Sequence, residues 1–406
     1  MPSRARRSLA GALILAAVVL WVLAARGLWH SSVPDDLKLP HVAATSLFGA
    51  SFLSSSRSYF ELLALDRLAA RIVLVLVLVL YARRGAALMR ESAAGRIGTG
   101  LLLGMLGFAL VWLAQLPFAL IAVWWERRHG VSHESYVGSV LDGFFSIGGR
   151  LLFISFALLV AMGLAGLTKR WWWAFAAPAF ATLALLFTYL GVYLVPKAEP
   201  LRDPTTAADV RALARAEGIP GTKAEVQDVH RFTTAPNAES VGFGATRRVI
   251  LWDTLLNGRF DRREVRVVIA HELGHLAHDH PLKRVGWLLL FLIPAAAIVA
   301  AVTARRGGLA RPESVPLALL VFMLLQLLAS PLMNVVSRRE EAEADWSALR
   351  ATRDPQAARA MFVHLAQTSR EDPDPPAWAY ALFEDHPTIV QRVAMVDAWQ
   401  ERDAVR

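Results

Sequence analysis

The chain has 406 residues, of which 55% are hydrophobic and only 19% are charged, and its mean hydropathy is +0.41. These values exclude an ordinary soluble protein and indicate a mainly helical protein embedded in a lipid bilayer. The net charge of +9 comes from arginines in short loops beside apolar runs, and no nucleic-acid-binding module is visible, so nucleic acid is not an expected partner. Because the chain has no cysteine, only His, Asp or Glu can hold a metal ion such as zinc.

Seven apolar runs are expected to form transmembrane helices, because each reaches about 20 residues together with its flanks. They lie at about residues 9–25, 59–81, 97–125, 151–167, 171–195, 285–303 and 315–336. We interpret the first run as a helix and not as a cleaved signal peptide, because no convincing small-residue cleavage site follows it. The second run contains Asp66, Arg67 and Arg71, which either face a bundle interior or a cavity, or extend to the interface from a tilted helix.

The region between the fifth and sixth apolar runs is polar and mixed. Apolar positions at helical spacing predict a helix at 203–218, and alternation predicts strands at 226–232 and 248–252. A further helix is expected to begin after Asp261, which can form a capping box with Glu264, and to end at Pro281. The tail from residue 337 onwards is polar and helical in pattern.

Within the helix that follows Asp261, His271 and His275 are four residues apart and therefore lie on one face. Together with Glu272 they form the pattern H-E-x-x-H, in which two neutral histidines bind zinc and the glutamate acts as general base. We interpret His278 and His280 as surface groups or hydrogen-bond partners of the ligands, not as ligands. A five-residue match also occurs by chance on surface helices, so a third ligand is needed.

The acidic run after the last apolar run offers that ligand. On a helix, Arg338, Glu341 and Asp345 share one face, whereas Glu340 and Glu343 project elsewhere. A run of this kind is usually a solvated helix face. The alternative is a metal ligand, because the two charged helices flank one apolar hairpin, which returns their ends to the same side of the membrane.

Further motifs accompany these two. In chain order the motifs are Asn237 to Gly244 with Arg248 to Leu256, His271-Glu-Leu-Gly-His275, Asn334-x-x-x-Arg338-x-x-Glu341-x-x-Ala344-Asp345, and Asp385-His386-Pro387-Thr388 followed by Arg392. With these motifs the sequence resembles the M48 metallopeptidases, and specifically the Ste24-type CAAX prenyl protease branch. It departs from the family at Asp279, where glycine is usual, and at Glu239, where relatives tend to carry an aromatic residue. The second departure bears on substrate preference.

The resemblance implies one zinc ion per chain, held by His271, His275 and Glu341, with Glu272 as the catalytic base. It implies a mainly helical membrane protein with about seven transmembrane helices and a zincin-like helical catalytic domain that carries a small β-element. Bound zinc lowers the pKa of a water molecule towards about 7, which suits attack on a peptide carbonyl.

The resemblance also implies roles for four residues outside this core. His386 is expected to stabilise the oxyanion, and Asp345 to act as a proton donor or as a carboxylate that orients a ligand histidine. Asn237 and Arg338 are expected to bind substrate, and Arg338 alternatively holds Asp345.

The leading hypothesis is a multi-pass membrane zinc endopeptidase whose partners are a polypeptide substrate and the lipid bilayer. We expect an N-terminal membrane domain at 1–196, catalytic parts at 197–284 and 337–406, and a transmembrane hairpin at 285–336. An intramembrane protease of the site-2 kind is disfavoured, because charged residues flank the H-E-x-x-H motif. A transporter whose buried charges line a path, and a membrane quality-control factor in which proteolysis is secondary, are the alternatives.

Orientation in the membrane is left open by two conflicting arguments. Basic residues gather at the N-terminus, around Arg83 to Arg96, at Lys169-Arg170 and around Arg305 to Arg311. The positive-inside rule makes these regions cytoplasmic and the catalytic parts external, whereas the family resemblance suggests a cytosolic zinc site. The Ala- and Arg-rich composition indicates a bacterial inner membrane, where membrane-associated or unfolded polypeptides are more plausible substrates than prenylated ones.

Overall fold

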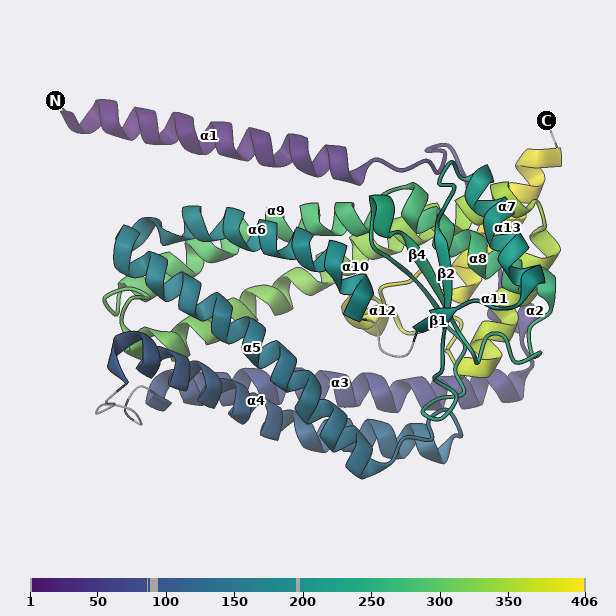
Figure 1. Cartoon of the computed structure of the whole chain (residues 1–406), viewed down its shortest axis with the longest axis horizontal. Coiled ribbons are helices and arrows are strands. Elements are labelled where there is room, and N and C mark those ends of the chain that lie inside the picture. The colour runs from purple at the N-terminus through teal and green to yellow at the C-terminus, as the bar shows by residue number, and fades with distance from the viewer. Residues whose placement is uncertain (1, 86, 88–93, 195–197, 405–406) are drawn as a thin grey trace.

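A computed structural model describes residues 2–85, 87, 94–194 and 198–404 (Figure 1). Long helices run side by side from one end of the molecule, and a smaller unit of short helices and one sheet forms the other end. The longer helices are α1 (Pro2–Trp29), α3 (Ala50–Arg84), α4 (Gly95–Arg128), α5 (Tyr136–Thr168), α6 (Trp172–Leu190), α9 (His280–Ala304) and α10 (Val315–Thr352). The other α-helices are α2 (Ala44–Leu47), α7 (Pro204–Ala216), α8 (Arg262–Ala277), α11 (Pro355–Ser369), α12 (Ala377–Phe383) and α13 (Ile389–Ala404), and 3₁₀ turns lie at Lys169–Trp171, Gly191–Leu194, Gly244–Thr246 and Pro312–Ser314.

Six of the seven apolar runs fall within α1, α3, α4, α5, α9 and α10, and the fifth overlaps α6 and the 3₁₀ turns on either side of it. Among the described residues, four stretches are long and apolar enough to cross a membrane, at Gly95–Arg128, Ser155–Leu190, His280–Ala304 and Pro312–Thr352. The chain is therefore a multi-pass membrane protein, while the expected number of seven spans stays a prediction. Two residues of these expectations lie outside the described residues: Val195, at the end of the fifth expected span, and Arg90, in one of the expected basic regions.

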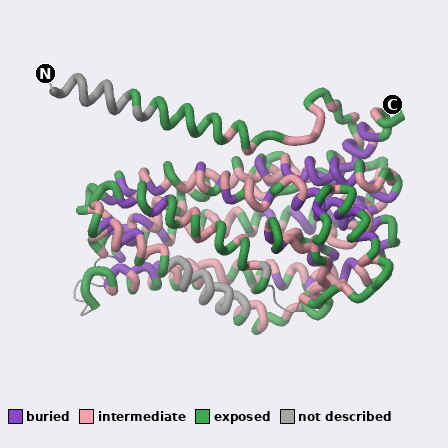
Figure 2. Tube along the Cα trace, turned by 45° about the horizontal axis from the view of Figure 1, so that its top comes forward, coloured by how far each residue is buried: buried purple, intermediate pink, exposed green. Residues whose placement is uncertain are grey.

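Burial is distributed unevenly between the two ends of the molecule. Buried residues gather in the end that holds the sheet, whereas the long helices carry many exposed and half-exposed residues along their length (Figure 2). Only 11–28% of the most apolar window of each candidate span is buried inside the protein. Extended apolar surface of this kind needs lipid around it, since soluble proteins rarely expose large apolar patches.

The charged residues of α3 contact the smaller unit. Arg67 Nη1 lies 3.4 Å from Glu384 Oε1, and Arg71 Nη1 donates to the carbonyl of Leu382 at 3.2 Å. These arginines therefore hold the end of α12 and the residue that follows it against α3, and this contact accounts for their position within an otherwise apolar run.

The sheet has four strands, β1 (Ala198–Pro200), β2 (Lys223–Gln227), β3 (Ala238–Val241) and β4 (Arg248–Trp252), in the order β1-β2-β4-β3. β4 runs parallel to β2 and antiparallel to β3, so β3 is an edge strand with one free side. β4 has the bounds expected from the sequence, but the strand expected at 226–232 is displaced. It ends at Gln227 because Asp253 Oδ1 accepts hydrogen bonds from the amides of Val229 and His230 and turns the chain away from the sheet.

Helix α8 begins where its sequence signals place it. The Asp261 carboxylate accepts from the Glu264 amide at 2.8 Å, and the Glu264 carboxylate accepts from the Asp261 amide at 2.8 Å, so the expected capping box is confirmed. The helix ends at Ala277 and not at Pro281, because Asp279 adopts a left-handed conformation with φ 53°. Pro281 lies in the first turn of α9, where its missing amide hydrogen has no cost.

Helix α8 lies against α10 at a glycine. A Cβ atom on Gly274 would lie 3.0 Å from the Ser347 Cβ and 3.2 Å from the Ala344 Cα, so no larger residue fits without moving α10. Small residues on both helices thus allow the two backbones to approach closely. Leu273 and Leu276 on α8 and Leu349 on α10 are all buried in the hydrophobic core next to this contact.

We predict that Gly274→Val pushes α8 and α10 apart and lowers the stability of the protein. Overpacking of this kind costs about 1–3 kcal/mol, and thermal unfolding in detergent micelles measures it. Gly163→Val is a matched control, since a Cβ at this helical glycine of α5 meets no atom within 4 Å. Equal unfolding temperatures for the two variants would contradict the close approach at Gly274.

Candidate metal centre

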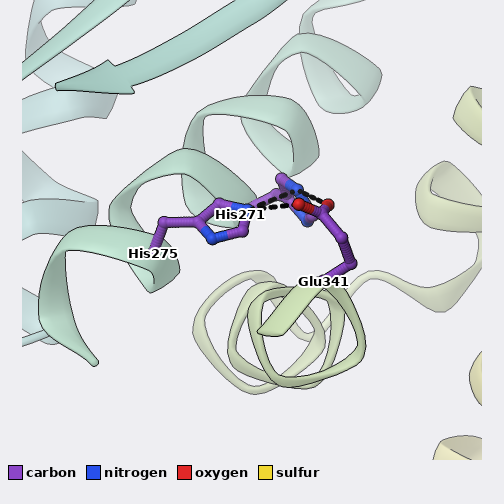
Figure 3. Close-up of side chains that lie close together, drawn as sticks. All are labelled: His271, His275 and Glu341. Atoms are coloured by element: carbon purple, nitrogen blue, oxygen red, sulfur yellow. Dashed lines mark hydrogen bonds and ion pairs between the residues drawn. The ribbon is translucent and has the colours of Figure 1, made fainter. Parts of the chain in front are cut away.

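Three buried side chains from α8 and α10 meet at one point. His271 Nε2 lies 3.1 Å from Glu341 Oε2, His275 Nε2 lies 3.4 Å from Glu341 Oε1, and the two Nε2 atoms are 3.1 Å apart. Figure 3 shows the two imidazoles of α8 directed towards the carboxylate that α10 supplies. The acidic run of α10 is thus no plain solvated face, since Glu341 is buried beside the two histidines.

The three side chains fit a divalent metal ion. Ligand atoms that surround a tetrahedral ion at about 2.0–2.2 Å lie about 3.3–3.6 Å from one another, close to the separations found here. Glu341 Oε2 is buried and accepts no hydrogen bond, so one of its lone pairs remains available to a cation. Burial lowers the pKa of His271, but Asp345 and Glu341 outweigh it and raise that pKa to about 10, so the cluster attracts positive charge.

Asp345 lies directly behind His271. The His271 Nδ1 donates to Asp345 Oδ1 at 2.8 Å, which leaves the Nε2 lone pair directed at the cluster. Arg392 from α13 donates to both oxygens of Asp345, at 2.8 and 2.6 Å. The guanidinium compensates the buried carboxylate, so Asp345 can orient the ligand imidazole without an unpaired charge.

His275 has a corresponding support, in one of the two roles that the sequence left open for His280. Its Nδ1 lies 2.7 Å from the Nδ1 of His280, and the Nε2 of His280 lies 3.0 Å from Glu343 Oε2. If His275 donates to His280, then His280 donates to Glu343, and every proton in the chain has an acceptor. Lys283 Nζ lies 3.2 Å from the same carboxylate oxygen. His280 and Glu343 are fully buried, so the expectation that Glu343 projects away from the site is wrong.

A signal for this support was present in the sequence. His280 follows His275 by five residues, and a buried histidine so close to a ligand often serves it as a hydrogen-bond partner. The spacing alone left two roles open for His280, and the contact between the two Nδ1 atoms identifies it as the partner of His275.

A cavity of about 490 Å³ opens over the three side chains. Glu272 lines it, and burial raises the pKa of its carboxyl, an effect that the neighbouring His271 opposes. Glu239 on the edge strand β3 and Asn237, the residue just before that strand, line the same cavity. The β-element therefore forms one wall of the site.

His386 also lines this cavity. Its Nε2 lies 3.3 Å from Glu341 Oε2, and its Nδ1 lies 2.8 Å from Asp385 Oδ1. The side chain of His386 is 50% exposed, so it faces the open cavity. Arg338 lies outside this cavity: its Nη1 donates to the carbonyls of Tyr380 and Glu384, at 3.2 and 2.6 Å.

Arg338 therefore does not have the contact with Asp345 that the sequence suggested, because Arg392 already occupies both oxygens of that carboxylate. The hydrogen bonds of Arg338 instead hold the segment that leads to His386. Of the residues expected at the site, the structure brings together His271, Glu272, His275, Glu341, Asp345, His386 and Asn237, and it leaves Arg338 apart.

Comparisons with known proteins agree with this geometry. The model of peptidase family M48 matches residues 200–400. The chain is 25% identical to an uncharacterised metalloprotease of Bacillus subtilis, YhfN, over 69% of each chain. It is also 25% identical to a CAAX prenyl protease 1 homolog of Oryza sativa, over 73% of each chain.

The fold is similar to that of a protein of known structure. The crystal structure of Ste24p from S. mikatae matches with a TM-score of 0.75 over 94% of this chain and 97% of that chain, at 16% sequence identity. The fold expectation is confirmed in its coarse form, as a mainly helical protein that carries a small sheet.

Two histidines one helical turn apart, an adjacent glutamate and a third ligand from another helix define a metallopeptidase. This class is confirmed by the match to peptidase family M48 and by the relative that carries the name metalloprotease. More particularly, the chain belongs to peptidase family M48.

We predict that His280→Ala weakens metal binding about 10–100-fold, because loss of a hydrogen-bond partner of a metal ligand typically has this effect. Competition with a chromophoric chelator measures the affinity directly and does not depend on proteolysis. His278→Ala is the control, since His278 contacts Glu343 at 3.4 Å but supports neither ligand histidine. The same affinity in both variants would rule out the role given to His280.

Proposed function

We propose that this protein is an integral membrane zinc endopeptidase that cleaves peptide bonds of polypeptides at the membrane surface. The observation that carries the proposal is the close approach of His271 Nε2, His275 Nε2 and the Glu341 carboxylate beneath a cavity that Glu272 lines. Zinc suits the set best among common metals, because two imidazoles and one carboxylate with an open fourth position are a typical catalytic zinc site. One ion per chain is expected.

The residues around the metal then have separate roles in the hydrolysis of the peptide bond. Bound zinc supplies a Lewis acid that acidifies water and polarises a carbonyl. Glu272 takes the proton of the attacking water and returns it to the leaving amine. Asp345 and His280 hold the two ligand imidazoles in the required tautomers.

His386 supports the negative charge that develops on the substrate carbonyl oxygen. It is the imidazole that faces the cavity from the side opposite α8, and Asp385 fixes its orientation through Nδ1. Asp385 and Glu341 raise the pKa of His386 against the effect of burial, which lowers it. A positively charged imidazole is a suitable electrostatic partner for an oxyanion.

The free side of β3 binds the substrate backbone. β3 is an edge strand, and its residues from Ala238 to Val241 line the cavity together with Asn237. An extended peptide can add to such an edge through main-chain hydrogen bonds, which places its scissile bond over the metal cluster. Asn237 is positioned to contact the peptide where it enters.

We predict that Glu272→Gln lowers peptide cleavage about 10²–10⁴-fold, because general acid–base catalysis is worth that factor. Purified protein in detergent and a fluorogenic peptide mixture provide the assay. Zinc content serves as the control, because glutamine at this position leaves all three ligands in place. Chelation is expected to abolish cleavage by the wild type, and added zinc to restore it. Unchanged cleavage by Glu272→Gln, or cleavage by the fully metal-free protein, would refute the proposal.

Polypeptides that are membrane-associated or unfolded are the proposed substrate class, and a bacterial inner membrane is the proposed location. Relatives of this chain include proteins named CAAX prenyl protease 1 and others named protease HtpX homolog. Both groups are consistent with a peptidase that works beside the bilayer. The composition in Ala and Arg favours a bacterial source over a cell that contains prenylated CAAX substrates.

Charge favours an orientation with the metal cluster outside the cytoplasm. Arg83 and Arg84 end α3, Lys169 and Arg170 lie between α5 and α6, and Arg306 follows α9 and donates to the carbonyl of Ala82 at 3.0 Å. In Figure 1 these turns lie at the end of the long helices remote from the sheet. The positive-inside rule makes that end cytoplasmic.

We predict that a periplasmic alkaline phosphatase reporter fused after residue 406 is active, and that a green fluorescent reporter at the same site is dark. A fusion in the loop between α9 and α10 is the matched control and is expected to give the opposite result. A fluorescent signal from the fusion at residue 406 would show that the metal cluster faces the cytoplasm and would contradict the proposed orientation.

A further inference from the structure

Among the described residues, most charged side chains that line the metal-site cavity are paired with opposite charges, and two carboxylates, Glu239 and Glu272, are not. The pairs are Arg284 with Glu340 at 2.8 Å, Arg392 with Asp345 at 2.6 Å, and His386 with Asp385 at 2.8 Å. Glu239 lines the cavity but forms no ion pair with any residue that the structure describes. Glu272 is the other carboxylate of the cavity that lacks a cationic partner, and it has the role of proton carrier.

The position of Glu239 in β3 determines what it can contact. Its Cα is paired with that of Ile250 in β4, and the flanking residues Ala238 and Ser240 project to the opposite face of the sheet. The side chain of Glu239 is exposed. A peptide added to the free side of β3 would place a residue directly opposite Glu239, with the two Cβ atoms about 4.5–5.5 Å apart.

We propose that Glu239 makes this peptidase select substrates that carry a lysine or arginine close to the scissile bond. The inference rests on the proposed function and on strand addition at β3. Opposite charges at directly opposed positions of neighbouring strands attract one another, and like charges repel. The cavity thus favours a basic side chain at one position and disfavours an acidic one.

The surroundings of Glu239 do not stabilise its negative charge. Partial desolvation in the cavity and the nearby Glu272 carboxylate both raise the pKa of Glu239. Both effects oppose its negative charge, and a cation on the substrate relieves both.

A set of peptides tests the inference. A neutral parent peptide that the wild type cleaves receives a single lysine at each of the three positions on either side of the scissile bond, with glutamine at the same position as the reference. We expect one position at which lysine raises kcat/KM about two- to fivefold over glutamine. In Glu239→Gln this ratio falls to about one, and in Glu239→Lys a glutamate at that position becomes the preferred residue.

Glu199→Gln is the matched control. Glu199 lies on β1, the opposite edge strand of the same sheet, and its side chain is 68% exposed. Its removal changes the net charge equally, so the lysine preference is expected to persist. A preference that is absent in the wild type, or that survives in Glu239→Gln, would overturn the inference while leaving the peptidase proposal intact.

A binding measurement separates the two proposals further. Fluorescence anisotropy with Glu272→Gln reports the affinity for the lysine and glutamine peptides without cleavage. Tighter binding of the lysine peptide that Glu239→Gln removes supports the inference even if cleavage is slow. Equal binding of both peptides, together with no cleavage by the wild type, would reject both proposals.

Discussion

The close contact between α8 and α10 is the constraint on which the site depends. Two histidines on one helix can offer two ligands, but the third comes from a residue about 70 positions later in the chain, beyond a membrane hairpin. A glycine at position 274 and small residues on α10 let the helix backbones approach closely enough for the Glu341 carboxylate to come within 3.1–3.4 Å of both imidazoles. The turn at Asp279 then directs α9 away, so that the hairpin closes on the same pair of helices.

The site contains many buried ionisable groups, and pairing of opposite charges is what keeps it stable. Unpaired charges in a protein interior cost several kcal/mol each, so each needs a partner. Arg392 compensates Asp345, Arg284 compensates Glu340, and the chain from His275 through His280 ends at Glu343 with Lys283 beside it. Glu341 Oε2, which lies beside His271, is buried without a hydrogen-bond partner, so negative charge remains where a divalent cation would be attracted.

The membrane helices contribute to the site as well as anchoring it. Arg67 and Arg71 on α3, and Arg338 on α10, all contact the end of α12 or the short segment that follows it. That segment carries His386, so three cations from two long helices hold the imidazole over the cavity. A sequence reading of α3 alone finds only charges in an apolar run, because their partners lie more than 300 residues away.

The local features were determined by the sequence itself. Period and composition predicted the long apolar helices, Asp261 and Glu264 predicted the start of α8, and the spacing of His271 and His275 predicted one shared face. These features depend on neighbours within a few residues, where propensity and hydrogen bonding are decided. Only the tertiary structure showed that Arg392 and not Arg338 holds Asp345, that His280 and Glu343 stand behind His275, and that β3 leaves a free edge carrying Glu239. Such pairings depend on helix crossings and strand order, which bring together residues far apart in the chain.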